Sequence, residues 1–290
     1  MRTRFDQLVK QLGLEALGPL GLTLVHHEIA PEVQYADIYH EPDPAHTADR
    51  DRLGLLGRIA SGPCLIEAYS QAVTDAEFRA CLGKHIAFWQ RRARKARMPE
   101  EQEPVLWIIT ARAPKSLVAR LGLVAAHGWP LGVYLFGDDV LRVGLIAADE
   151  LLCDTSTLLV RLMAGGPLLP QVLAELIVLP EDAYERIVAG PVLLRLHHAL
   201  VKKPSRTSEE EEIIVATEDF FEFAREQGQK QGRAEARAND VLTVLRVRGI
   251  SVPDTERERI LAEADPARLE RWLERAIVEP SLAGVLDEPS

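Results

Sequence analysis

The hydrophobic pattern of the first 70 residues changes from a helical period to a strand period. Apolar residues at helical spacing near the N-terminus predict a helix over residues 5–17. Three strand-like runs follow, and they cover residues 22–29, 32–40 and 63–69. The last run is short and apolar, which is typical of a buried central strand. The segment therefore predicts one helix followed by three strands.

A second helix and further strands are predicted up to residue 146. Thr74 and Glu77 have the spacing of a capping box, so a helix is expected to start there and to run to about Arg97. A short helix is also expected over residues 48–60, in the long connection before the third strand. The pattern then predicts a strand over 105–110, a helix over 114–125, and strands over 132–136 and 141–146.

From Thr155 onward the pattern predicts only helices. Asp265 is expected to cap the last of them, with Pro266 at its first position, and a break is expected at Gly190-Pro191. The expected helices cover residues 156–178, 181–203, 209–228, 230–249, 254–264 and 266–278. The fold class is therefore an α/β N-terminal domain with a mixed sheet, followed by an all-α C-terminal half.

Three regions are predicted from this pattern. Residues 1–150 form the α/β domain, and residues 151–228 form a helical region packed on it. Residues 229–290 form a polar helical connector and a small C-terminal helical unit. A chain of 290 residues with 47% hydrophobic residues is long and apolar enough for two ordinary domains.

Composition narrows the environment in which the protein is expected. No stretch has the ~18 uncharged apolar residues of a membrane span, and the N-terminus meets Asp6 before any apolar run, unlike a signal peptide. The three cysteines, Cys64, Cys81 and Cys153, are far apart and odd in number, which favours a reducing compartment. We therefore expect a cytoplasmic protein without a membrane partner.

The charge distribution bears on nucleic-acid binding. The net charge of −10 argues against a general nucleic-acid coat. Residues 1–150 nevertheless hold 17 Lys+Arg against 19 Asp+Glu, whereas residues 151–290 hold 17 against 25. A nucleic-acid site is therefore expected in the first half.

Several common catalytic motifs are absent from the sequence. There is no phosphate-loop lysine motif, no glycine fingerprint after a strand and no nucleophile elbow. The pairs His26-His27 and His197-His198 do not converge on one metal, since neighbouring residues point to opposite faces of a strand or lie about 100° apart on a helix.

Two acidic residues stand out within the predicted strands. Strand alternation places Asp37 beside Tyr35 and Tyr39, and it places Glu67 in a run of apolar residues. A buried carboxylate is costly unless it is paired or bound to a cation, so two on neighbouring strands suit one Mg²⁺. The alternative is that each acid neutralises a nearby arginine in a structural ion pair, and the spacing leaves both interpretations open.

A set of short segments carries a family resemblance. They are Phe5-Asp6, Tyr35-Ala36-Asp37-Ile38-Tyr39, Cys64-Leu65-Ile66-Glu67, Arg79, Leu106-Trp107-Ile108-Ile109, residues 128–134 and residues 157–162. Together they resemble the PD-(D/E)XK nucleases, and more closely the bacterial recombination-promoting nuclease/transposase family. The shared core plan is α-β-β-β-α-β, with Asp on the second strand and Glu on the third. The resemblance implies a Mg²⁺- or Mn²⁺-dependent DNA endonuclease in which Asp37 and Glu67 bind the metal.

The chain departs from that family at the position of the catalytic cation. The family has Lys or Gln two residues after the Glu, where this chain has Tyr69, and Ala36 stands where Pro usually precedes the Asp. A phenol stabilises negative charge far less than an ammonium, and losing such a group costs roughly 10²–10³ in rate. Lys84 or Arg79 on the following helix are the candidate substitutes, with Arg79 the one expected to clamp an acid. The resemblance therefore implies weak activity, or alternatively an inactive nuclease fold that acts as a binding or self-assembly module.

Two further features concern partners. The densest basic run, residues 91–97, includes Arg91, Arg92, Arg94 and Lys95, which are candidates to contact DNA phosphates. The same run would also complement the helix dipole and the acidic residues 100, 101 and 103. Broad apolar stripes in the helical half predict a homo-oligomer; they include Leu168, Val172, Leu176, Phe220, Phe221 and Phe223.

Overall fold

The computed structural model describes residues 4–29, 34–95 and 103–287, and it divides the chain into two compact units. The first unit is Met1–Phe220 and the second is Phe221–Ser290. The predicted helical region after residue 150 therefore belongs, up to Phe220, to the same unit as the sheet. Within the described ranges, no helix combines the length and the apolarity that a membrane crossing requires.

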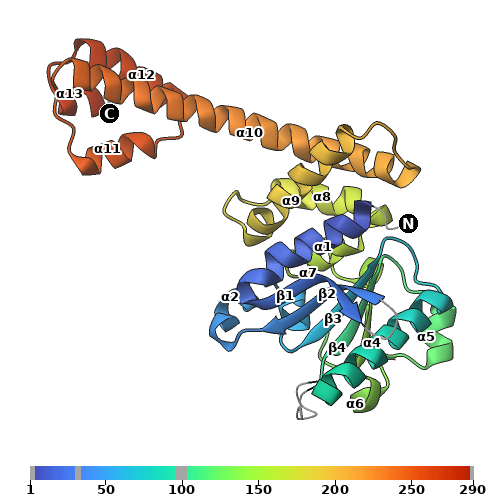
Figure 1. Cartoon of the computed structure of the whole chain (residues 1–290). Coiled ribbons are helices and arrows are strands. Elements are labelled where there is room, and N and C mark those ends of the chain that lie inside the picture. The colour runs from blue at the N-terminus through green and yellow to red at the C-terminus, as the bar shows by residue number, and fades with distance from the viewer. Residues whose placement is uncertain (1–3, 30–33, 96–102, 288–290) are drawn as a thin grey trace. The chain divides into compact units, whose positions relative to one another are not determined.

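A seven-stranded mixed sheet forms the centre of the first unit (Figure 1). Its order is β1-β2-β3-β4-β7-β6-β5; β3, β4 and β7 are parallel, and the remaining neighbours are antiparallel. The strands are β1 (Gly21–Ile29), β2 (Gln34–Pro42), β3 (Cys64–Tyr69), β4 (Val105–Thr110), β5 (Val124–Ala125), β6 (Val133–Phe136) and β7 (Val143–Ala147).

Helices cover both faces of this sheet (Figure 1). The helices of the first unit are α1 (Arg4–Leu17), α2 (Thr47–Asp51), α3 (Leu55–Ile59), α4 (Asp75–Lys95), α5 (Lys115–Leu121), α6 (Asp138–Leu141), α7 (Thr155–Ala164), α8 (Leu169–Val178) and α9 (Tyr184–Val201). The chain continues through α10 (Ser208–Val247), which runs into the second unit, and ends in α11 (Asp254–Leu261), α12 (Pro266–Val278) and α13 (Leu282–Leu286). The predicted α/β half followed by an all-helical half is confirmed.

The alternation of β4 shows how the sheet separates two cores. Leu106 and Ile108 pack with α4 and α5, whereas Trp107 and Ile109 pack with α1, α7 and α8 on the opposite face. All four side chains are at most 4% exposed. A strand buried on both faces needs a continuous apolar run, which is the signal that the sequence shows at residues 105–110.

Two predicted helices differ from the observed ones at glycine or proline positions. The helix expected over 156–178 is interrupted, since Gly165 takes a φ of 56°, which is outside the right-handed helical region, and α8 restarts at Leu169. The break expected at Gly190-Pro191 is absent, and α9 continues through Pro191. Burial of Ala189, Val192 and Leu193 on the same helix outweighs the one backbone hydrogen bond that the proline removes.

The predicted break between residues 228 and 230 was wrong, because α10 is one helix of 40 residues. Gly228 and Gly232 each cost about 1 kcal/mol relative to Ala, but no proline interrupts the segment. Side-chain pairs four residues apart support it, such as Gln231 Nε2 donating to Glu235 Oε1 at 3.0 Å. Conversely, the helix expected over 114–125 ends at Leu121, and the two-residue strand β5 follows it.

The second unit has its own small core. Ala234, Ala238, Val241 and Leu245 recur every three or four residues along α10 and pack with apolar residues of α11, α12 and α13. Asp265 caps α12 as predicted, with its carboxylate accepting a hydrogen bond from Ala267 N at 3.0 Å.

Part of the apolar surface expected to mediate self-association is buried inside the first unit. Val172, Leu176 and Phe220 are at most 4% exposed and belong to the core on the α1/α7 side of the sheet. These residues are therefore not available to a second copy. Other apolar side chains of this unit are exposed, including Val178 at 80% and Val215 at 75%.

Candidate active site

Asp37 lies where β2 leaves its regular pairing with β3. The register between these strands pairs Ile38 with Ile66, so Asp37 and Glu67 are the next positions along each strand. Asp37 Oδ2 accepts a hydrogen bond from the backbone N of Ala68 at 3.2 Å, so the side chain bonds a strand amide. Ala36 and Tyr39 both pack on the α4 side of the sheet, which interrupts strict alternation between them.

Glu67 forms an ion pair with Lys84. The Lys84 ammonium lies 2.9 Å from Glu67 Oε1 and 2.8 Å from Oε2, with the lysine reaching down from α4 to β3. The side chain of Glu67 is 4% exposed and that of Lys84 is 20% exposed. Of the two candidate cations, the structure brings Lys84 to the acid.

Asp37 is paired with a lysine that the sequence did not single out. Lys10 Nζ on α1 lies 3.6 Å from Asp37 Oδ1, and the side chains are 4% and 12% exposed. Lys10 sits among Leu8, Val9 and Leu12, which are the buried residues of the predicted helix. The sequence signal for Lys10 is its place next to core positions of an amphipathic helix, and that signal does not identify its partner.

Both acids affect the pKa of Cys81, a buried thiol on α4. Burial is the main cause that raises the pKa of this thiol to about 12; the negative charges of Glu67 and Asp37 act in the same direction, and the Tyr69 hydrogen bond and the Lys84 charge act against it. Both carboxylates therefore act on one buried thiol of α4. A thiol with a pKa this high is a poor nucleophile at neutral pH, so Cys81 contributes to packing and not to catalysis.

Tyr69 stands two residues after Glu67, where the nuclease resemblance implies a catalytic cation, and it makes different contacts. Its hydroxyl lies 3.1 Å from Cys81 Sγ. Burial, followed by the neighbouring Cys81 and the negative charge of Glu67, raises the pKa of the phenol above its usual range. Tyr69 is therefore neutral and cannot supply the positive charge that this position carries in the nuclease plan.

Arg79 is not part of this cluster. Its side chain is exposed, and its Nε donates to the backbone oxygen of Asp75 at 3.0 Å on the same helix. The expected clamp on Asp37 or Glu67 was therefore wrong for Arg79, and the two lysines take that place. A position one turn after the Thr74 cap faces away from the sheet because Phe78, its neighbour, occupies the buried side of α4.

The basic run at the end of α4 is only partly available to phosphates. Arg92 pairs with Glu41 Oε1 at 3.3 Å and donates to the hydroxyl of Tyr39. Its guanidinium also lies 5.9 Å from the centre of the Phe88 ring. Arg91 is half-exposed, and the side chains of Arg94 and Lys95 lie outside the described part of the chain.

The cluster has the donor set of a hard-cation site without a third protein ligand. Among the described residues, no three His, Cys, Asp or Glu side chains are grouped so that they could hold a metal ion. Asp37 and Glu67 offer carboxylate oxygens, which suit Mg²⁺ or Mn²⁺, and such an ion would complete its shell with water and phosphate oxygens. Comparisons of the chain with protein-family models, curated proteins and solved structures give no match.

Proposed function

We propose that the chain is a metal-dependent phosphodiester hydrolase of the nuclease type, with DNA as its substrate. The observation that carries this proposal is the ion pair of Lys84 with Glu67. Glu67 lies across from Asp37 on the neighbouring strand. A cation on α4 beside a two-strand acid pair supplies the charge that the family keeps two residues after the Glu. The order α1, β1, β2, β3, α4, β4, with the short helices α2 and α3 inserted between β2 and β3, supports the proposal because it is compatible with the core plan of the resembled nucleases.

Each residue has a distinct role in this proposal. Asp37 and Glu67 would hold a Mg²⁺ or Mn²⁺ ion, and such an ion would supply Lewis-acid polarisation of the phosphate and a more acidic water. Lys84 neutralises charge that develops on the phosphate, and Lys10 holds the Asp37 carboxylate in position. Partly exposed Arg91, near the end of α4, is a candidate contact for the DNA backbone.

A second candidate function is a non-catalytic binding module on the same fold. Two observations favour it: each acid has a lysine partner, so the pairs are already compensated, and Tyr69 is neutral. In this case the four side chains stabilise the sheet as ion pairs and bind no metal.

Cleavage of supercoiled plasmid DNA separates these functions. The wild type is expected to nick the plasmid slowly with Mg²⁺ and not with EDTA, and Glu67→Gln is expected to lower the rate at least 10²-fold. Tyr69→Lys is expected to raise it by restoring the missing charge. Glu15→Gln serves as the matched control, because it removes an exposed carboxylate of α1 and should leave the rate unchanged.

Two results would contradict the enzyme proposal. No nicking by the wild type together with no gain in Tyr69→Lys would overturn the enzyme proposal and leave the binding module. Equal nicking by wild type and Glu67→Gln would assign the activity to a contaminant.

A further inference from the structure

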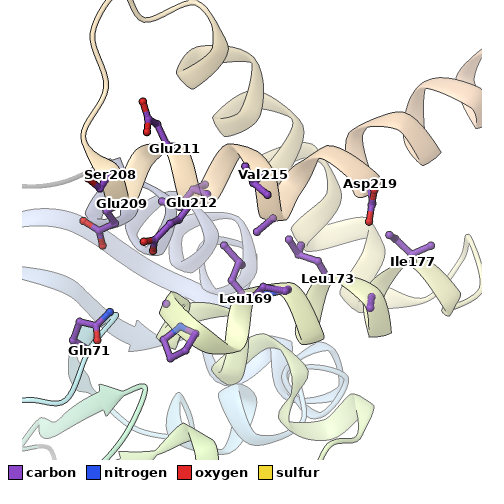
Figure 2. A pocket seen from close by; sticks show the side chains of 16 residues that line it. Gln71, Leu169, Leu173, Ile177, Ser208, Glu209, Glu211, Glu212, Val215 and Asp219 are labelled. Carbon is purple, nitrogen blue, oxygen red and sulfur yellow. The ribbon is translucent and has the colours of Figure 1, made fainter.

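A groove in the first unit lies between α8 and the first turns of α10, and neither Asp37 nor Glu67 lines it. Its volume is about 740 Å³, and Gln71, which follows β3, closes one end. Figure 2 shows Leu169, Leu173 and Ile177 in a row along α8, with Val215 opposite them on α10. This volume is in the range of small-molecule sites, about 300–1,000 Å³, so a larger partner would insert only one row of its side chains into the groove.

The floor of the groove is an elongated apolar strip. Leu169 and Leu173 are only 2% exposed, so the surface that α8 offers to a partner comes mainly from Pro170, Ala174 and Ile177, which lie on one face of the helix and span about 10 Å. Val215, on the α10 side, is 75% exposed. An apolar side chain left this open beside an apolar strip gains free energy when a partner covers it, by about 25 cal/mol per Å² of surface removed from water.

The rim of the groove is acidic. Glu209, Glu211, Glu212 and Asp219 line it, and its lining, all of which belongs to the described chain, includes no Lys or Arg. Glu212 and Asp219 are seven residues apart, so they lie on one face of α10, two turns from each other, with Val215 between them. Ser70 Oγ donates to Glu209 Oε1 at 2.9 Å and so fixes one of these carboxylates at the end near β3. The α10 wall therefore presents acid, apolar side chain and acid in sequence.

We infer that this groove binds a cationic amphipathic helix of a partner protein. A third helix that lies in the groove would cover the apolar strip and pack against α8 and α10 at interaxial distances of about 8–10 Å. Leucine-like side chains at four-residue spacing match the strip, and Lys or Arg flanking them match the carboxylates of the rim. Carboxylates spaced along two turns of α10, from Glu212 to Asp219, match cations repeated along a partner helix better than the single charge of a small molecule. The site is independent of the proposed nuclease activity.

The probe for this inference is a fluorescein-labelled peptide of about five turns, with Leu at four-residue spacing on one face and Lys on both flanks. Fluorescence anisotropy with the full chain is expected to show binding at least tenfold tighter than that of a peptide with the same composition and scattered leucines. Binding is expected to weaken as salt increases, because the rim charges are exposed. Equal binding of the two peptides would overturn the inference.

Two variants locate the site. Glu212→Lys/Asp219→Lys is expected to weaken binding about tenfold or more, and Val215→Lys about as much by placing a charge on the apolar strip. The matched control is Glu226→Lys/Asp240→Lys, which makes the same charge change at exposed positions of the same helix outside the groove. Thermal melts establish that each variant is folded.

Three outcomes would overturn the inference. One is an equal loss of affinity in the groove and control double variants. Another is displacement of the fluorescent peptide by dodecylamine at similar concentration, which would assign the groove to small cationic amphiphiles. The third is self-association in sedimentation that is lost in Val215→Lys, which would assign it to a second copy of the chain.

Discussion

Replacing Lys84 with methionine is expected to lower the free energy of unfolding by about 3 kcal/mol, because it leaves the buried carboxylate of Glu67 without its partner. This value is at the low end for buried ion pairs, since the lysine side chain keeps 20% of its exposure and part of the charge is screened. Methionine retains the length and apolar contacts of the lysine stem, so the change reports mainly on the charge. Chemical denaturation of both proteins measures the difference.

Arg79→Ala is the control for Lys84→Met on the same helix. Arg79 is exposed and bonded within α4, so this change is expected to shift the free energy of unfolding by less than about 0.5 kcal/mol. The reverse order, with Arg79→Ala the more destabilising variant, would show that the arginine and not the lysine compensates the buried acid. The two variants together therefore decide which cation belongs to the cluster.

Lys10→Met is expected to destabilise the first unit by about 3 kcal/mol for the same physical reason, through Asp37. The double variant Lys10→Met/Asp37→Asn is expected to recover most of that loss. Asparagine keeps an oxygen that can accept the hydrogen bond from Ala68 N while removing the unpaired charge. A double-mutant cycle with both single variants measures the coupling between the two positions.

Two outcomes would contradict a stabilising role for the Lys10–Asp37 ion pair. If Lys10→Met changes stability by less than about 0.5 kcal/mol, the Lys10–Asp37 ion pair contributes little to the stability of the first unit. A coupling near zero would lead to the same conclusion.

The sequence predicted the sheet well because its strands carry strong local signals. Residues 105–110 and 63–69 are apolar runs of strand length. The predicted capping box at Thr74 is also confirmed, since Thr74 N donates to Glu77 Oε2 at 2.8 Å. Helix ends were less predictable where two effects compete. At Pro191 and Gly228 the local cost of the residue is smaller than the gain from packing or from side-chain pairs, and only the folded structure shows which is larger.

The candidate site was predictable in its two acids and in one of its two cations, Lys84. Asp37 and Glu67 stand out because a carboxylate within an apolar strand needs compensation. The partner of each acid is set by tertiary contact: Lys10 comes from 27 positions earlier and Lys84 from 17 positions later. Lys84 was a candidate only because the family resemblance calls for a cation near Glu67, and Lys10 was not considered because a lysine on a helix is normally solvated.

Mn²⁺ binding tests the central claim that Asp37 and Glu67 form a cation site. Electron paramagnetic resonance of free Mn²⁺, followed as the protein is titrated, counts the bound ions. We expect the wild type to bind one Mn²⁺ that Mg²⁺ displaces, and Asp37→Asn/Glu67→Gln to lose it, with Glu15→Gln unchanged. Equal binding by the wild type and the double variant, or no binding by the wild type, would contradict the metal site. The two acids would then be explained by their ion pairs with Lys10 and Lys84.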